Sequence, residues 1–455
     1  MLACSAAPPP AAPPAPPARR PVVAVALAAP APAALPAGVP DSTAGHQLVW
    51  VLAAIAKAPS EADAATHFTP DFLAKVPAAT VVGLFGQIST GAPFTLESVS
   101  AATNGLPTEL VAVVRATDGS KIRIWLSVDP ATGQMGGLLL RPKVDAKTAA
   151  SWGEVLADLQ AVGPKVSFLA AEVDGGKCLP ISSLEPKRPL ALGSTFKLYV
   201  LDALARQVAT GKHAWDEQVV IRDALKSLPS GAMRDEPPGK AFSVEHFAEQ
   251  MISVSDNTAT DHLLDLVGRS AVEDAVTGTG HQTPSVMQPF LKTRELFALK
   301  LLASQEERAT YVSLDLPHRR KLLDKYGAKD LAPAMAAASG FTKPIMVDKL
   351  EWFASPEDLC RVMVDLHTRA QTPALAPIAS ILSLNPGFPD ENHQYAYIAF
   401  KGGSEPGVLN LTFLMQRARD SKWLFMTAGW NDTAAPIDET KAFAAVVSAR
   451  EFLGR

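Results

Sequence analysis

The segment GSTFKLYVLDALARQ, residues 193–207, carries the feature on which the predicted fold and chemistry depend. Ser194 and Lys197 stand three residues apart, a spacing that places both side chains on one face of a helix. A serine in the first helical turn lies beside unpaired backbone amides, which favour developing negative charge. A lysine with a pKa lowered by burial can remove the serine proton. Alone the motif is weak, because it also fits an ordinary helix start with a solvated lysine.

Two further polar motifs strengthen the prediction. Ser255-Asp256-Asn257 separates two predicted helices, 243–253 and 258–267, and three small polar residues suit a loop that presents side chains to a cleft. The alternative for this motif is a simple helix cap.

The third motif, Lys401-Gly402-Gly403-Ser404, is predicted to end a strand over residues 395–400. Its glycines would permit close approach of a substrate backbone. The alternative is an ordinary strand-terminating turn.

In the order Ser-x-x-Lys, Ser-Asp-Asn and Lys-Gly-Gly, the three motifs resemble those of the serine β-lactamase and penicillin-binding protein superfamily, most nearly class A. The resemblance covers about residues 146–455 and implies a β-lactamase or DD-peptidase-like α+β domain, with an antiparallel sheet flanked by helices. The two-domain layout is similar to β-lactamase-related proteins with an isomerase-like front domain, one of them linked to clavulanic acid gene clusters.

The resemblance implies a catalytic role for four residues. Ser194 attacks an acyl carbon and Lys197 takes its proton. Ser255 relays a proton to the leaving group with the help of Lys401, which also attracts an anionic substrate carboxylate as a point charge.

The resemblance also implies substrate contacts at Asn257, Gly403 and Ser404. Asn257 would position the amide side chain of the substrate. Backbone amides of Ser194 and Ser404 would form an oxyanion hole, typically worth roughly 3 kcal/mol per donor. Gly402 departs from the family pattern, because Thr or Ser usually supplies a carboxylate-binding hydroxyl there; Ser404 is the candidate replacement.

A second departure concerns release of the acyl group. The Glu-x-x-Leu-Asn element, whose carboxylate activates the deacylating water in class A enzymes, is missing from residues 272–290. Glu295 is the nearest downstream acid and the candidate base, although it also fits the first turn of the next helix.

Residues 41–145 are predicted to form a small α+β domain. Asp41 and Ser42 are predicted to cap a first helix that carries apolar residues over 48–55, and a second helical stretch follows over 72–88. Strands follow over 94–101, 110–116, 121–128 and 135–141. This order resembles a steroid-isomerase-like cone or a cystatin-like fold. No acid/base constellation is evident, which favours a structural or docking role.

Residues 1–40 consist mainly of alanine and proline, a composition that cannot bury a core. They are predicted to be a disordered leader, an export signal or a tether. Cys4 resembles the lipidated residue of a bacterial lipoprotein signal, and a second export reading places the apolar region after Arg19-Arg20. Either reading predicts an exported, periplasmic or cell-envelope protein.

The composition of the chain argues against nucleic-acid-binding, membrane-spanning and metal-dependent proteins. The 455 residues carry 42 basic and 46 acidic side chains, a net charge of −4 that gives no reason to expect nucleic acid as a partner. A lipid anchor would be the only membrane link, because no apolar run is long enough to span a bilayer. The nine histidines lack metal-ligand spacing, so neither a metal nor a cofactor is predicted. A Cys178–Cys360 bridge remains open.

We therefore expect a serine hydrolase that forms an acyl-enzyme with a small acyl substrate, such as a β-lactam, a D-alanyl peptide or an ester. The alternatives are a DD-peptidase or esterase, and a slow-turnover penicillin-binding acyl trap or ligand-binding envelope protein.

Overall fold

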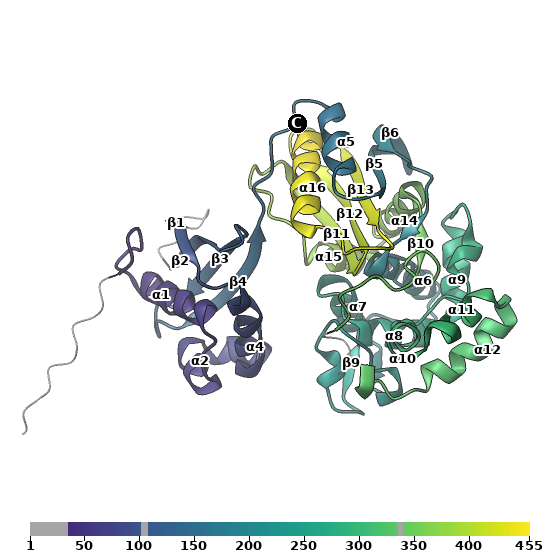
Figure 1. The fold of residues 1–455 in the computed structure, drawn as a ribbon, viewed down its shortest axis with the longest axis horizontal. Coiled ribbons are helices and arrows are strands. Elements are labelled where there is room, and N and C mark those ends of the chain that lie inside the picture. The colour runs from purple at the N-terminus through teal and green to yellow at the C-terminus, as the bar shows by residue number, and fades with distance from the viewer. Residues whose placement is uncertain (1–34, 102–107, 335–339) are drawn as a thin grey trace, which may run out of the picture. The chain divides into compact units, whose positions relative to one another are not determined.

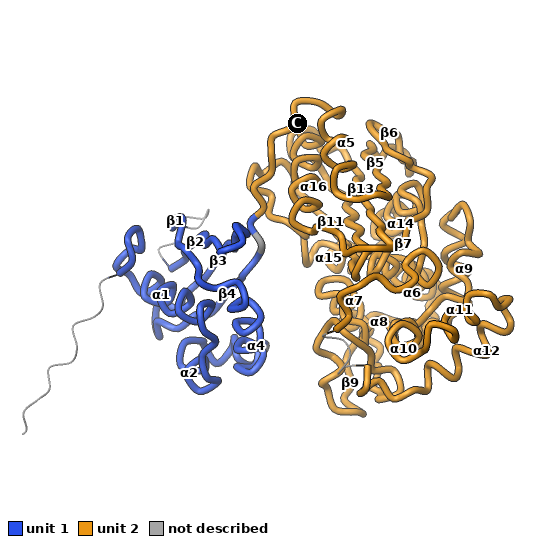
Figure 2. Tube along the Cα trace, in the orientation of Figure 1, with its two compact units in different colours: residues 1–143 blue, residues 144–455 orange. Residues whose placement is uncertain are grey.

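The computed structural model describes residues 35–101, 108–334 and 340–455. The chain forms two compact units, residues 1–143 and 144–455 (Figures 1 and 2). Residues 1–34 of the predicted leader lie outside the described residues, and Cys4 with them, so export and lipidation stay predictions.

The smaller unit packs four helices against one antiparallel sheet in the order β1-β2-β3-β4. Its elements are α1 (Thr43–Ala56), α2 (Glu61–His67), α3 (Pro70–Lys75), α4 (Ala78–Ile88), the 3-10 turn η1 (Ser89–Gly91), β1 (Thr95–Ala101), β2 (Glu109–Arg115), β3 (Lys121–Val128) and β4 (Met135–Lys143). As predicted, Ser42 caps the first helix, accepting a hydrogen bond from the Gly45 amide at 3.1 Å. The single helix predicted over 72–88 is instead two, because the residue before Pro77 is held out of the helical conformation.

The larger unit is built from these elements: α5 (Trp152–Gln160), β5 (Lys165–Asp174), β6 (Lys177–Leu184), β7 (Leu190–Ala191), η2 (Gly193–Phe196), α6 (Lys197–Ala209), β8 (Gln218–Val220), η3 (Asp223–Leu225), η4 (Met233–Asp235), β9 (Ala241–Ser243), α7 (Val244–Ser253), α8 (Asn257–Val267), α9 (Arg269–Gly278), η5 (Pro284–Met287), α10 (Thr293–Leu302), α11 (Gln305–Ser313), α12 (Leu316–Gly327), β10 (Phe353–Ala354), α14 (Pro356–Arg369), η6 (Pro373–Leu375), α15 (Pro377–Ser383), β11 (Tyr395–Glu405), β12 (Val408–Arg417), β13 (Trp423–Asn431) and α16 (Glu439–Gly454).

Its main sheet has five antiparallel strands in the order β11-β12-β13-β5-β6. Strands from the two ends of the unit are neighbours in it, since β13 pairs with β5. One face packs against α5 and α16 through an apolar cluster that includes Leu159, Trp430 and Val446 (Figure 1). A larger cluster, centred on α6, fills the space on the opposite face. Both units thus have the α+β class predicted from the sequence.

The strand β11 is longer than predicted. The sequence prediction ended it before Lys401, at the glycines, but β11 continues to Glu405. Gly402 and Gly403 pair with Leu411 and Asn410 of β12, so the third motif lies within the ladder and not in a turn. Glycine weakens a strand, but it does not end one in which the residues before and after it are paired with the neighbouring strand.

A disulfide joins Cys178 of β6 to Cys360 of α14, across 182 residues of sequence. The sequence left this pairing open, and β6 itself was not predicted. The bridge ties the edge strand of the main sheet to a buried helix.

Replacing both cysteines, Cys178→Ser with Cys360→Ser, is expected to lower the free energy of unfolding by about 4 kcal/mol, because a cross-link closing so long a loop restricts the unfolded chain. Urea titration of the wild type and the double variant would measure this. A reducing agent should destabilise the wild type and leave the double variant unchanged; equal stabilities would contradict the prediction.

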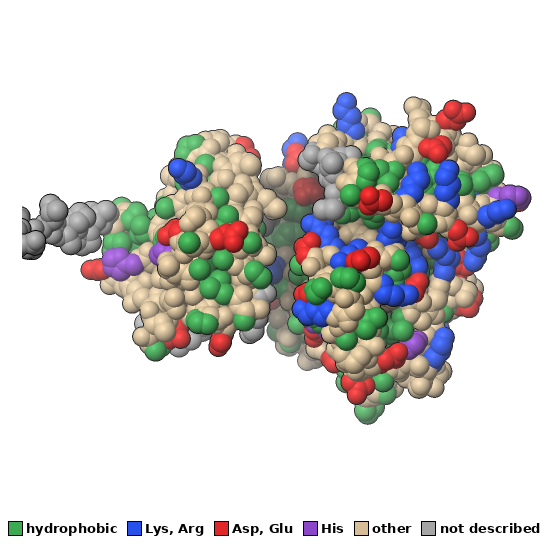
Figure 3. Space-filling view, turned by 90° about the horizontal axis from the view of Figure 1, so that it is seen from below, with side chains coloured by type: hydrophobic (Ala, Val, Ile, Leu, Met, Phe, Trp, Pro, Cys, Tyr) green, Lys and Arg blue, Asp and Glu red, His purple; other side chains and the backbone are tan. Residues whose placement is uncertain are grey.

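Charged side chains of both signs are intermixed over the larger unit on the face shown in Figure 3. Within the described residues, no helix combines the length and the apolar character needed to cross a membrane. The same residues contain no cluster of three or more His, Cys, Asp or Glu side chains that could hold a metal ion.

Candidate functional site

One cavity of about 710 Å³ brings the three sequence motifs together. The residues come from η2, from the turn between α7 and α8, and from β11. Six predicted site residues line it: Ser194, Ser255, Asn257, Lys401, Gly403 and Ser404. Lys197 lies beneath them, with no exposed surface.

The candidate nucleophile lies on a tight turn. The sequence placed Ser194 in the first turn of a helix; it lies in the 3-10 turn η2, which runs directly into α6 at Lys197. Gly193 precedes it with a φ of +51°, a left-handed conformation that favours glycine. A Cβ atom at Gly193 would also lie 2.8 Å from the amide nitrogen of Ser404, so a side chain there would separate η2 from β11.

Lys197 is held by three oxygen atoms. Its Nζ donates to the carbonyl oxygen of Ser255 and to Asn257 Oδ1, both at 2.6 Å, and lies 3.0 Å from Ser255 Oγ. Burial lowers the pKa of Lys197 well below its usual value, and the charge of Lys401 lowers it further. A buried amine with a lowered pKa can exist in the neutral form that accepts a proton.

Ser255 links the two lysines. Its hydroxyl lies 3.0 Å from Nζ of Lys197 and 3.0 Å from Nζ of Lys401. Its backbone has a φ of +59°, a left-handed conformation that is unusual for serine. The carbonyl oxygen of Ser255 is fixed in this conformation by Lys197 and by Ser230 Oγ at 2.6 Å. Asp256 meanwhile caps α8 through the Ala259 amide at 2.8 Å, so the motif is both a helix cap and part of the cavity.

Lys401 extends from β11 into the cavity wall. Besides Ser255 it contacts the carbonyl oxygen of Gly402 at 2.6 Å. Burial lowers its pKa to about 7. The charge of Lys401 therefore changes within the physiological pH range.

Gly403 lets β11 touch the nucleophile turn. A Cβ atom there would lie 2.2 Å from the carbonyl oxygen of Leu192 and 2.4 Å from the amide nitrogen of Ser194. This close approach favours the predicted oxyanion hole, because it brings the backbone of β11 against that of η2. Gly402 is explained differently: a Cβ atom there would lie 2.8 Å from the ring of Phe400, which occupies the space of the missing hydroxyl.

Asn257 is buried and holds the lysine in place. Its Oδ1 accepts from Lys197, and Nδ2 gives one of its two hydrogens to the carbonyl oxygen of Leu228. The second hydrogen is available to a substrate amide, and that contact stays a prediction.

Glu295, the candidate base taken from the sequence, does not face the cavity of Ser194, and the structure corrects that prediction. Both its carboxylate oxygens accept from Arg269, at 2.6 and 3.1 Å, and one also accepts from the Lys292 amide at 2.8 Å. It does not line the Ser194 cavity. The alternative noted in the sequence, a carboxylate in the first turn of α10, is its role.

Sequence reasoning missed two parts of the cavity lining. Aromatic side chains line it at Phe297, Phe341, Phe400 and Phe443. The prediction also missed Glu405, an acidic lining residue four positions after Lys401 on the same strand. Strand alternation places positions 401, 403 and 405 on one face, and this signal would have found Glu405 had the strand been predicted long enough.

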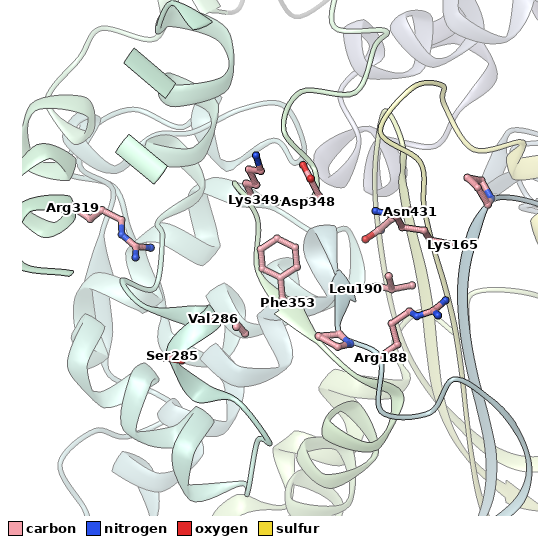
Figure 4. A pocket seen from close by; sticks show the side chains of 12 residues that line it. Lys165, Arg188, Leu190, Ser285, Val286, Arg319, Asp348, Lys349, Phe353 and Asn431 are labelled. Carbon is pink, nitrogen blue, oxygen red and sulfur yellow. The ribbon is translucent and has the colours of Figure 1, made fainter. Parts of the chain in front are cut away.

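A second, larger cavity of about 840 Å³ lies elsewhere in this unit (Figure 4). Lys165, Arg188, Arg319 and Lys349 border it together with Asp348. None of the three motifs reaches it, so we take the Ser194 cavity as the candidate active site.

The fold and this cluster of serine and lysine side chains define a domain of the serine β-lactamase and penicillin-binding protein type. Residues 153–370, which lie within the larger unit, match the model of the beta-lactamase enzyme family, and this match supports the serine β-lactamase and penicillin-binding protein superfamily for that unit. Residues 39–134 match a second family model, described as the N-terminal part of the ORF 12 gene product. No curated protein matches the sequence.

Solved structures show the same similarity at low identity. A β-lactamase from Sphaerobacter thermophilus DSM 20745 is 22% identical, with 67% of this chain and 96% of that chain covered and a TM-score of 0.46. A β-lactamase from Desulfarculus baarsii DSM 2075 is 16% identical, with coverages of 68% and 100% and a TM-score of 0.47. PBP-A is 15% identical, with coverages of 68% and 99% and a TM-score of 0.43.

Proposed function

We propose that this protein is a serine hydrolase that forms an acyl-enzyme at Ser194, acting on β-lactams or on related amides and esters. The observation that carries the proposal is the convergence of Ser194, Ser255 and Lys401 on one cavity, together with the buried Lys197 that contacts Ser255. The β-lactamase-like fold of the larger unit supports a serine-hydrolase type of function in general.

In the proposed acylation step, the neutral Lys197 amine takes the proton of the Ser194 hydroxyl as Oγ attacks the acyl carbon. Backbone amides of Ser194 and Ser404 hold the developing oxyanion. The proton then passes through Ser255, which contacts both lysines, to the leaving nitrogen or oxygen. The acyl group stays on Ser194 as an ester.

The test of this proposal is direct capture of the intermediate. The full chain is incubated with penicillin G or a chromogenic reporter ester, and intact-mass spectrometry is followed by peptide mapping. Mass added at Ser194 supports the proposal. No adduct and no turnover with either compound would contradict it.

The pH dependence of substrate binding should separate anionic from neutral substrates. Because the pKa of Lys401 is about 7, its charge is present below that pH and lost above it. KM for the anionic penicillin G is expected to rise roughly tenfold between pH 6 and pH 8.5, while KM for the neutral ester changes little. Steady-state kinetics, or titration of binding, would measure this. In Lys401→Arg, which keeps its charge, KM for penicillin G should no longer rise with pH. An equal rise of KM for both substrates in the wild type would contradict the prediction.

A slow-turnover acyl trap is the second candidate function. It is favoured by the position of Glu295, which is bound to Arg269 and absent from the Ser194 cavity. A trap would keep the added mass for hours after excess penicillin is removed. A hydrolase would lose it within minutes and turn over repeatedly.

We also propose that the protein works outside the cytoplasm. Disulfides persist in oxidising compartments, and the Cys178–Cys360 bridge fits such a location. Fractionation of cells producing the natural chain, with mass analysis of its N-terminus, would show whether the leader is cleaved and whether Cys4 carries lipid.

A further inference from the structure

A buried cluster of three charged side chains lies at the end of β11. Nζ of Lys300 donates to Glu351 Oε1 at 2.8 Å and also contacts the carboxylate of Glu405. The side chains of Lys300 and Glu351 are completely buried, and that of Glu405 is 6% exposed. Two carboxylates thus share one ammonium group.

Glu405 belongs to this cluster and to the candidate active site. It lines the same cavity as Ser194, and among the described residues it is the only acidic side chain that does so. On β11 it shares a face with Lys401, which reaches Ser255, and with Gly403, which touches the nucleophile turn. Two residues of strand span about 6.6 Å, so the backbone of Glu405 lies within a side chain's reach of that turn.

The helix α10 supports the same placement. Phe297 and Lys300 stand three residues apart and share one face of it. Phe297 lines the cavity, so Lys300 contacts Glu405 from the face of α10 that is turned toward the cavity.

The charges around Glu405 allow its carboxyl group to gain and lose a proton. The groups set against Glu405 are Lys300 of α10 and Glu351, which precedes β10. Burial and the charge of Glu351 raise the pKa of Glu405 well above its usual value, against the lowering effect of Lys300. When Glu405 is protonated, Lys300 and Glu351 remain as a neutral pair.

We propose that Glu405 is the general base that activates water to release the acyl group from Ser194, replacing the carboxylate that the sequence lacks. The inference rests on the proposed function. The Glu405 carboxylate takes a proton from water, and the water oxygen forms a bond to the acyl carbon. The bond from that carbon to Ser194 Oγ then breaks, and the protonated Glu405 returns the proton to Oγ, which regenerates the carboxylate. The products are the free acid and the original serine.

A purely structural role for Glu405 would have a different signature. A latch between β11 and α10 would affect the melting temperature and both chemical steps together. A base would affect release of the acyl group alone, and release would fail as pH falls through the pKa of Glu405, because the protonated carboxyl cannot accept a proton.

The experiment uses the full chain with penicillin G and the reporter ester, and follows formation and loss of the Ser194 adduct by mass. Glu405→Gln keeps the shape and an oxygen that can accept from Lys300, while Glu351 still balances the ammonium charge. This variant is expected to acylate within about threefold of the wild-type rate and to retain the adduct at least 100-fold longer. Glu405→Asp keeps a carboxylate, so its adduct lifetime should lie between those of the wild type and Glu405→Gln. This second variant keeps the test decisive if Glu405→Gln fails to fold.

The control is Glu351→Gln. Removing this neighbouring charge lowers the pKa of Glu405, so the acidic limb of adduct loss should move to lower pH by about one unit. Adduct loss from Glu405→Gln at the wild-type rate would overturn the inference, as would a wild-type adduct that persists for hours. Both results would leave acylation at Ser194 intact, whereas absence of any adduct would remove the proposed function and this inference together.

Discussion

Replacing Ser194 with alanine is expected to abolish the covalent adduct with penicillin G and to lower kcat/KM for the reporter ester by roughly 10⁴-fold or more. The reason is that the other groups of the cavity only assist in the proposed mechanism, in which Lys197, Ser255 and Lys401 move protons and carry charge. Without an oxygen nucleophile beside them, no ester intermediate can form. Intact mass and single-turnover kinetics would measure both effects.

The matched control for this variant is Ser253→Ala. Ser253 lines the same cavity, but its hydroxyl donates at 2.6 Å to the carbonyl oxygen of Glu249 in its own helix. The Ser253→Ala variant should therefore be acylated by penicillin G at nearly the wild-type rate. An adduct that survives Ser194→Ala would show that another group is the nucleophile.

Replacing Lys197 with methionine is expected to slow acylation about 1000-fold, within the range typical of a lost general base. Methionine has a similar length but cannot accept the Ser194 proton. In the wild type, burial and Lys401 lower the pKa of Lys197, so the neutral amine is present above that pKa and lost as pH falls through it. The acidic limb of the acylation rate should disappear in the variant. Rapid-mixing measurements across a pH series would show both changes.

Stability must be measured alongside, because Asn257 Oδ1 loses its donor in this variant. A buried acceptor without a partner costs about 1–3 kcal/mol, so the melting temperature should fall. Lys240→Met, which removes an exposed lysine of the same unit, is the control for loss of a positive charge. Wild-type acylation with an unchanged pH profile in Lys197→Met would exclude the lysine as the base.

The two carboxylates considered for deacylation show how sequence distance misleads. Glu295 was chosen because it follows the expected place of the missing element, and Arg269 on α9 takes up its carboxylate instead. Glu405 was overlooked because the strand was predicted to end at the glycines. Its proposed role depends on Lys300 and Glu351, which lie 105 and 54 positions away in the chain.

The amino-acid sequence by itself determined the α+β class of both units, the helices-then-strands order of the smaller unit and the three motifs with their spacing. Those features depend on local signals: apolar periodicity, capping residues and the reach of side chains one helical turn apart. It could not determine the Cys178–Cys360 bridge, the partner of Glu295, the aromatic lining or the position of Glu405. Each of these depends on which distant segments pack together, and only burial of the shared core decides that. The depressed pKa values of Lys197 and Lys401 have the same origin, since desolvation exists only once the chain has closed around them.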